Sequence, residues 1–124
     1  MKNTLRESDI RLHLKISLLS SEDEEFLGPG VLELLGRIAS TGSIQRAARD
    51  MNLSYVKALK ILKRMEAGLP HPVLIRHKGG HERGSSRLTP YGLRLLEKYT
   101  EFRNQTLQYA LRHFMTFKKD VLNE

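Results

Sequence analysis

The 124-residue sequence contains no cysteine and no tryptophan. The lack of cysteine excludes disulfide bonds, thiolate metal sites and thiol catalysis. No apolar run approaches the roughly 18 residues of a membrane-spanning helix, and the first residues lack the apolar core of a signal peptide. We therefore expect a cytoplasmic protein without a membrane partner. Its length suits a single domain, residues 1–124.

The five histidines do not form a ligand pattern. His71, His77 and His81 are irregularly spaced without matching carboxylates, and His13 and His113 are distant from them. They suit phosphate contacts or solvent exposure better than a metal site. No nucleophile–base pair or carboxylate dyad is evident either, so we predict neither enzymatic activity nor a cofactor.

The excess positive charge is concentrated in one stretch. The net charge is +7, and residues 54–94 hold nine Lys or Arg and two Glu, which accounts for all of it. Such a basic stretch is typical of a surface that binds a polyanion, although charge alone also fits a solvated cationic face.

The sequence pattern predicts a mainly α fold with a small β component, a winged helix-turn-helix. Residues 10–19 alternate between apolar and polar side chains, as in a half-buried amino-terminal strand, and an acidic turn follows. The winged helix-turn-helix is expected at residues 28–90. Its predicted parts are helices over 28–40, 44–51 and 54–67 and strands over 73–76 and 87–88, and a long dimerisation helix over 91–119 follows it. Ser43, Ser54 and Thr89 are the expected caps of the second, third and last helices.

The third helix is predicted to be the recognition helix. At about 100° per residue, Ala58, Leu62 and Met65 share one side, and the opposite arc of about 120° carries cations and no acid. A major-groove helix needs such a face because phosphates flank the groove. The exposed arc consists of Val56, Lys57, Lys60, Lys63 and Arg64.

The hairpin after this helix is predicted to be a basic, glycine-rich wing over residues 76–87. Its glycines permit close approach to a phosphate backbone, and no Gly-Lys-Ser/Thr motif supports a nucleotide-binding loop instead. An unstructured hairpin tip is the other interpretation. The predicted contacts are Arg76, Lys78, His81, Arg83 and Arg87.

Several short motifs resemble the amino-terminal domain of LysR-type regulators, and more closely the DNA-binding domain of the molybdate-responsive ModE regulators. The strand before the first helix, Leu53-Ser54-Tyr55 and the paired wing glycines favour the ModE type. The resemblance covers about residues 10–99. The other motifs are Gly42-Ser43-Ile44, Ala47-Ala48, Arg64-Met65-Glu66, Leu88-Thr89-Pro90-Tyr91-Gly92 and Leu95-Leu96.

This resemblance implies a bacterial transcription regulator that binds double-stranded DNA. ModE regulators carry molybdate-binding domains after the long helix, and this sequence ends at Glu124. We therefore expect a stand-alone form without a molybdate site in this chain. The resemblance adds Ser43, Gln45, Ser54 and Tyr55 to the predicted DNA contacts, and Arg46 is also predicted to contact DNA.

The last helix is predicted to form a homodimer. Its apolar residues spread over about 200° of the wheel, whereas one core contact needs roughly 100°. Its polar face mixes charges of both signs, which argues against a membrane-surface helix. The predicted dimer residues are Leu96, Tyr99, Phe102, Leu107, Ala110, Leu111, Phe114 and Phe117.

Two other functions are alternatives to sequence-specific DNA binding. A winged-helix module that binds proteins without DNA is the main alternative, and the lysine-rich recognition face argues against it. An RNA-binding protein is the third, weakened by the lack of exposed aromatic residues suited to base stacking.

Overall fold

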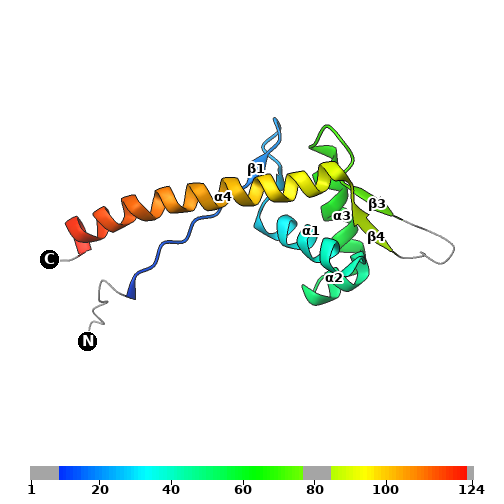
Figure 1. Ribbon diagram of the computed structural model, residues 1–124, viewed down its shortest axis with the longest axis horizontal. Helices are drawn as coiled ribbons and strands as arrows, with labels where there is room; N and C mark the ends of the chain where they lie inside the picture. Colours follow the sequence, from blue (N-terminus) through cyan, green and yellow to red (C-terminus); the bar gives the residue numbers. More distant parts are fainter. Residues whose placement is uncertain (1–8, 77–84, 123–124) are drawn as a thin grey trace.

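The computed structural model describes residues 9–76 and 85–122, and it shows a mainly helical protein with two small antiparallel sheets (Figure 1). The predicted fold class, a winged helix-turn-helix with a long last helix, is confirmed. In chain order the elements are β1 (Leu18–Leu19), β2 (Glu25–Leu27), α1 (Pro29–Thr41), α2 (Ile44–Asp50), α3 (Tyr55–Ala67), β3 (Leu74–Arg76), β4 (Ser86–Leu88), α4 (Pro90–Phe117) and the π-helical segment η3 (Lys118–Leu122).

Ser43, Ser54 and Thr89 cap α2, α3 and α4 as predicted. A capping side chain accepts a hydrogen bond from a backbone N–H in the first turn, which otherwise has no partner inside the helix. Gly42 ends α1 with a φ of 72°, a left-handed conformation that glycine adopts without steric cost. The cap bonds are Arg46 N to Ser43 Oγ at 3.1 Å, Lys57 N to Ser54 Oγ at 3.0 Å and Gly92 N to Thr89 Oγ1 at 3.0 Å.

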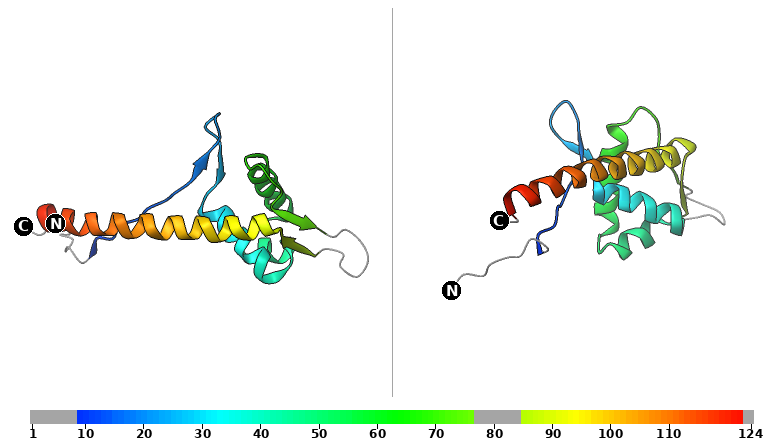
Figure 2. Two further views of the ribbon diagram at one scale, coloured as in Figure 1. Left: turned by 45° about the horizontal axis from the view of Figure 1, so that its top comes forward. Right: turned by 60° about the vertical axis from the view of Figure 1, so that its left-hand side comes forward.

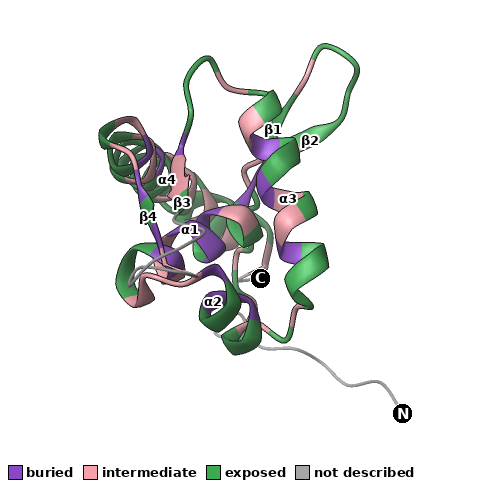
Figure 3. Cartoon of the chain, turned by 90° about the vertical axis from the view of Figure 1, so that its right-hand side faces the viewer, coloured by how far each residue is buried: buried purple, intermediate pink, exposed green. Residues whose placement is uncertain are grey.

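The core lies between α1, α2 and α3, with residues from β2, β4 and α4 closing it. Ala47 and Ala48 of α2 are almost fully buried, and their small side chains allow the helices to cross closely. In Figure 3 buried, intermediate and exposed stretches alternate along α3, as expected for a helix with one side in the core. The largest fully buried side chains are Leu27, Leu34, Leu35, Ile38, Met65 and Val73.

The prediction of an amino-terminal strand over residues 10–19 is wrong for most of that range. Only Leu18–Leu19 form a strand, paired antiparallel with β2, which the sequence analysis did not predict. Residues 10–17 are extended but pair with no strand among residues 9–76 and 85–122 (Figure 2). Leu12 and Leu14 instead lie beside α4, where they line a pocket together with Arg103 and Leu107. Their alternation has another cause, because Ile16 packs against the core while Lys15 faces solvent.

The helix α4 has two different halves. Its first half packs on the domain, where Gly92 and Tyr99 are buried, and the Tyr99 hydroxyl donates a hydrogen bond to the Ile16 carbonyl. Its distal half projects beyond the helix-turn-helix (Figure 1). At 28 residues, α4 is about 42 Å long, more than the domain requires. In residues 9–76 and 85–122, no helix is long and apolar enough to cross a membrane.

Gly92 allows α4 to approach Val73, the residue before β3, which gives a stability prediction. A Cβ atom at this position would lie 2.5 Å from the Val73 carbonyl oxygen and 3.0 Å from Val73 Cγ1. We expect Gly92→Ala to lower the free energy of unfolding by about 1–3 kcal/mol, because the backbone must move to relieve the overlap. Urea denaturation followed by circular dichroism measures this change.

The matched control is Gly36→Ala in α1, where a Cβ atom would meet nothing within 4 Å. The same substitution there should raise the free energy of unfolding by about 0.5–1 kcal/mol, because alanine favours a helix interior. Equal effects of both substitutions would contradict the close contact between α4 and Val73.

Candidate nucleic-acid interface

The turn between α2 and α3 fixes where α3 begins relative to α2. Asn52 adopts a φ of 57°, a left-handed conformation that asparagine tolerates better than most residues. The Leu53 N–H then donates a 2.9 Å hydrogen bond to the Ala48 carbonyl, which closes the turn against α2. The first three residues of α3, Tyr55, Val56 and Lys57, are exposed.

The outer face of α3 is cationic, as predicted. Ala58, Leu62 and Met65 are buried, with exposed fractions of 0%, 3% and 0%. Within residues 9–76 and 85–122, none of the cations on α3 forms a salt bridge, so their charge is available to a polyanion. The exposed residues of α3 include Tyr55, Val56, Lys57, Lys60, Lys63 and Arg64.

Glu66 is the one acidic residue of α3, and the structure gives it a role that the sequence analysis missed. Its carboxylate accepts hydrogen bonds from the backbone N–H groups of Val73, at 2.8 Å, and Leu74, at 3.3 Å. It therefore ties the end of α3 to β3, instead of weakening the cationic face. The sequence signal for this role is that Glu66 is the one acid on an otherwise basic helix.

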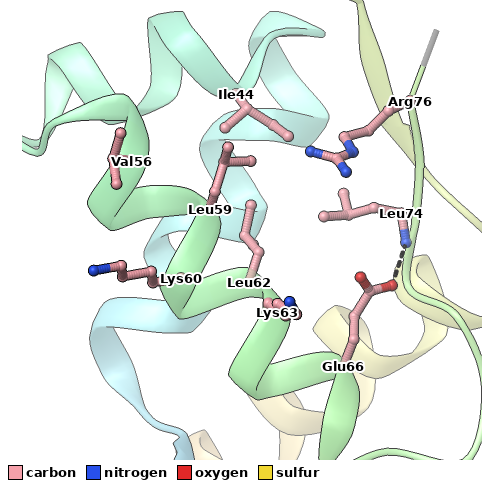
Figure 4. A pocket seen from close by; sticks show the side chains of 9 residues that line it. All are labelled: Ile44, Val56, Leu59, Lys60, Leu62, Lys63, Glu66, Leu74 and Arg76. Atoms are coloured by element: carbon pink, nitrogen blue, oxygen red, sulfur yellow. Dashed lines mark hydrogen bonds between the residues drawn. The ribbon is translucent and has the colours of Figure 1, made fainter. Parts of the chain in front are cut away.

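A groove of about 480 Å³ separates α3 from β3 on this side of the domain. Leu59, Leu62 and Leu74 form its apolar wall, and the Arg76 guanidinium extends beside it (Figure 4). Lys60 and Lys63 come from the facing helix. The groove thus combines an apolar wall with cations from two elements. Its lining residues are Ile44, Val56, Leu59, Lys60, Leu62, Lys63, Glu66, Leu74 and Arg76.

The two strands of the wing carry one exposed arginine each. Arg76 pairs with Ser86, and Arg87 pairs with Ile75, so the strands are in register up to the end of the described hairpin. The Ser86 N–H donates a 2.8 Å hydrogen bond to the Gly42 carbonyl, which joins β4 to the end of α1. The predicted wing contacts Lys78, His81 and Arg83 lie outside the described residues.

The predicted contacts in α2 and in the helix caps come before α3 in the sequence or at its start. Gln45 and Arg46 are exposed on α2. Ser43 and Ser54 use their hydroxyl oxygens as helix caps, which explains both residues without a ligand. Each hydroxyl still has a proton to donate.

The predicted dimer surface needs one correction. Tyr99 is only 6% exposed and belongs to the core of its own chain, so it cannot contribute its side chain to a surface. Burial raises the pKa of the Tyr99 hydroxyl above its ordinary value and so favours the protonated, donating form. Leu96 also packs partly against this core. Beyond Tyr99, the exposed large apolar residues of α4 are Phe102, Tyr109, Leu111, Met115 and Phe117, with Leu107, Ala110 and Phe114 partly exposed.

The sequence pattern of a known family matches residues 30–93, from the start of α1 to the start of α4. This range contains the complete helix-turn-helix, both wing strands and the cationic face of α3. The chain belongs to the lysR family of bacterial regulatory helix-turn-helix proteins. Its members are regulators, in agreement with the prediction that the protein is not an enzyme.

Three curated relatives are similar to this lysR-family chain. The Transcriptional regulator ModE of Haemophilus influenzae is 36% identical over 99 residues, which cover 80% of this chain and 35% of the relative. The Molybdenum transport protein ModE of Azotobacter vinelandii is 38% identical over 68 residues, covering 55% and 25%. The DNA-binding transcriptional dual regulator ModE of Escherichia coli K12 is 33% identical over 93 residues, covering 75% and 34%. The chain thus spans about a third or less of the length of these relatives.

Charge reversal on α3 tests the interface. Lys60 is exposed, and its position points away from the buried Ala58 and Leu62. We expect Lys60→Glu to lower the affinity for a specific duplex more than tenfold, because it places an anion against phosphate. Fluorescence anisotropy with a labelled duplex measures the affinity, and circular dichroism checks that the fold is unchanged.

The matched control is Lys119→Glu, which changes the net charge equally at an exposed position of η3. It should weaken binding far less. A folded Lys60→Glu protein that binds as well as the control would show that this face of α3 does not contact the duplex.

Proposed function

We propose that this protein is a sequence-specific, double-stranded-DNA-binding transcription regulator. The observation that carries the proposal is the face of α3, whose cations are exposed and form no salt bridge within residues 9–76 and 85–122, while the opposite side is buried. A helix with this distribution enters the major groove between two rows of phosphates. Membership of the lysR family and the printed name of the Escherichia coli relative support the same function.

The first turn of α3 makes the base contacts in this proposal. Tyr55, Val56 and Lys57 are the first residues of the helix, and recognition helices place their N-terminal residues against base edges. Lys60, Lys63 and Arg64 follow on the exposed side and contact phosphates or bases. Gln45 and Arg46 of α2, with the Ser43 and Ser54 hydroxyls, supply contacts to the flanking backbone.

The wing contacts the backbone beside the groove. Arg76 and Arg87 are exposed on β3 and β4, and Arg76 extends beside the groove next to α3 (Figure 4). These two cations neutralise phosphates independently of sequence and hold the domain in register on the duplex. The sequence adds Lys78, His81 and Arg83 to this proposed surface.

We also propose a homodimer formed through the part of α4 beyond Tyr99. Phe102, Tyr109 and Phe117 are 49%, 59% and 52% exposed on a helix that extends beyond its own domain. Single exposed apolar residues are ordinary, but repeated ones along an unsupported helix indicate a partner surface. A second copy also doubles the contacted DNA, which raises discrimination against competing genomic sites.

Selection from a random duplex library tests the proposed function. The bound fraction should converge on an inverted repeat, because a two-fold dimer presents two identical recognition helices. The half-site centres should lie about 34–36 Å apart, one helical turn, or a multiple of it. Convergence on no sequence, or retention of duplex without dependence on salt concentration, would contradict sequence-specific binding.

Sedimentation equilibrium at micromolar concentration tests the dimer. The intact chain should sediment at twice its mass of 14.3 kDa. Phe117→Glu places a charge on the exposed apolar stripe and should shift the protein toward monomer. Thr116→Glu, at the adjacent exposed position, is the control and should remain dimeric. A wild-type monomer, both free and on DNA, would contradict the dimer.

A further inference from the structure

Val56 is the most apolar group on the proposed DNA-binding face. Its side chain is 62% exposed in the first turn of α3, and Lys57 and Lys60 are its neighbours on the exposed side. Valine lowers helix propensity because its branched Cβ restricts the side chain, so it does not favour the helix by itself. An exposed valine among cations therefore needs another explanation.

The surroundings of Val56 make an apolar patch at the end of the α3–β3 groove. Val56 lines this groove together with Ile44 and Leu59. In Figure 4 its side chain lies on the outer side of α3, on the side where Lys60 projects. Ile44 is 2% exposed and Leu59 is half-buried, so Val56 is the member of this patch that reaches solvent. A partner that meets it must present a small apolar group within a polyanionic surface.

DNA offers one such group in the major groove. The C5-methyl of thymine is the apolar feature among base edges that otherwise present hydrogen-bond donors and acceptors. Residues in the first turn of a recognition helix reach those edges, and Val56 is the second residue of α3. The valine side chain has no hydrogen-bonding group, so it cannot distinguish the other bases by donors or acceptors.

We propose that Val56 selects thymine at one position of each half-site by packing against its C5-methyl group. This inference rests on the proposed function, because it requires α3 to lie in the major groove. It assigns a specificity role to one residue, whereas the lysines supply attraction that is shared by every sequence.

The test uses the duplex obtained by selection, with each thymine replaced in turn by deoxyuridine, which lacks only the methyl group. Wild-type affinity should fall about threefold to tenfold at one thymine per half-site, since burial of one methyl-sized group contributes about 0.8 kcal/mol or more. Val56→Ala should bind the thymine and deoxyuridine duplexes equally at that position. Its affinity should resemble that of wild type on the deoxyuridine duplex.

A second pair of duplexes separates the methyl group from the base pair. At the same position, wild type should bind a 5-methylcytosine·guanine pair more tightly than a cytosine·guanine pair, and Val56→Ala should not distinguish them. Val121→Ala is the matched control, an identical change at a 52% exposed valine in η3, and it should keep both preferences. Thermal unfolding checks that both variants keep the wild-type fold.

The inference is overturned if wild type shows no loss at any deoxyuridine, or if Val56→Ala loses as much as wild type. In either case convergent selection would leave the proposed function standing. Failure of the selection itself would remove the proposed function together with this inference.

Discussion

The burial of one side of α3 against α1 and α2 is the constraint on which the rest of the structure depends. Ala58, Leu62 and Met65 are each 3% exposed or less, so the helix cannot rotate without exposing them. Each buried Leu or Met contributes about 1.5–3 kcal/mol relative to an exposed one. Because this packing fixes the orientation of the helix, the lysines of α3 point to solvent.

The wing depends on the same helix for its position. The Glu66 carboxylate holds the start of β3 through two backbone N–H groups, and the Thr89 N–H donates a 2.8 Å hydrogen bond to the Val73 carbonyl. Gly92 then allows α4 to approach Val73 closely. The cationic face of α3, the wing arginines and the long helix are therefore held as one unit, which is the arrangement that a duplex of fixed groove geometry requires.

The sequence predicted the parts of this protein that local rules determine. Caps at Ser43, Ser54 and Thr89 form their expected bonds, and the wheel of α3 separates buried from exposed residues correctly. The predictions that were wrong concern features that depend on contacts between distant segments. The alternation of residues 10–17 indicated a strand, but a strand needs a partner, and only Leu18–Leu19 find one in β2.

Two further residues show the same limit of prediction from the sequence. Tyr99 lies on the apolar side of α4, and nothing in that helix alone indicates that its hydroxyl meets the Ile16 carbonyl and that it belongs to the core. Glu66 looked like an acid outside the cationic arc, yet its carboxylate accepts N–H groups seven and eight residues further along the chain. Helix periodicity identifies which side of a helix is apolar, but not which partner covers it.

The central claim is that the exposed face of α3, and not another surface, meets the duplex. Backbone amide NMR shifts recorded during titration with the selected duplex test it most directly, because every described element reports separately. The account predicts the largest shifts at residues 43–46, in the first three turns of α3, and at Arg76 and Arg87. Largest shifts confined to the distal half of α4, with α3 unchanged, would contradict it.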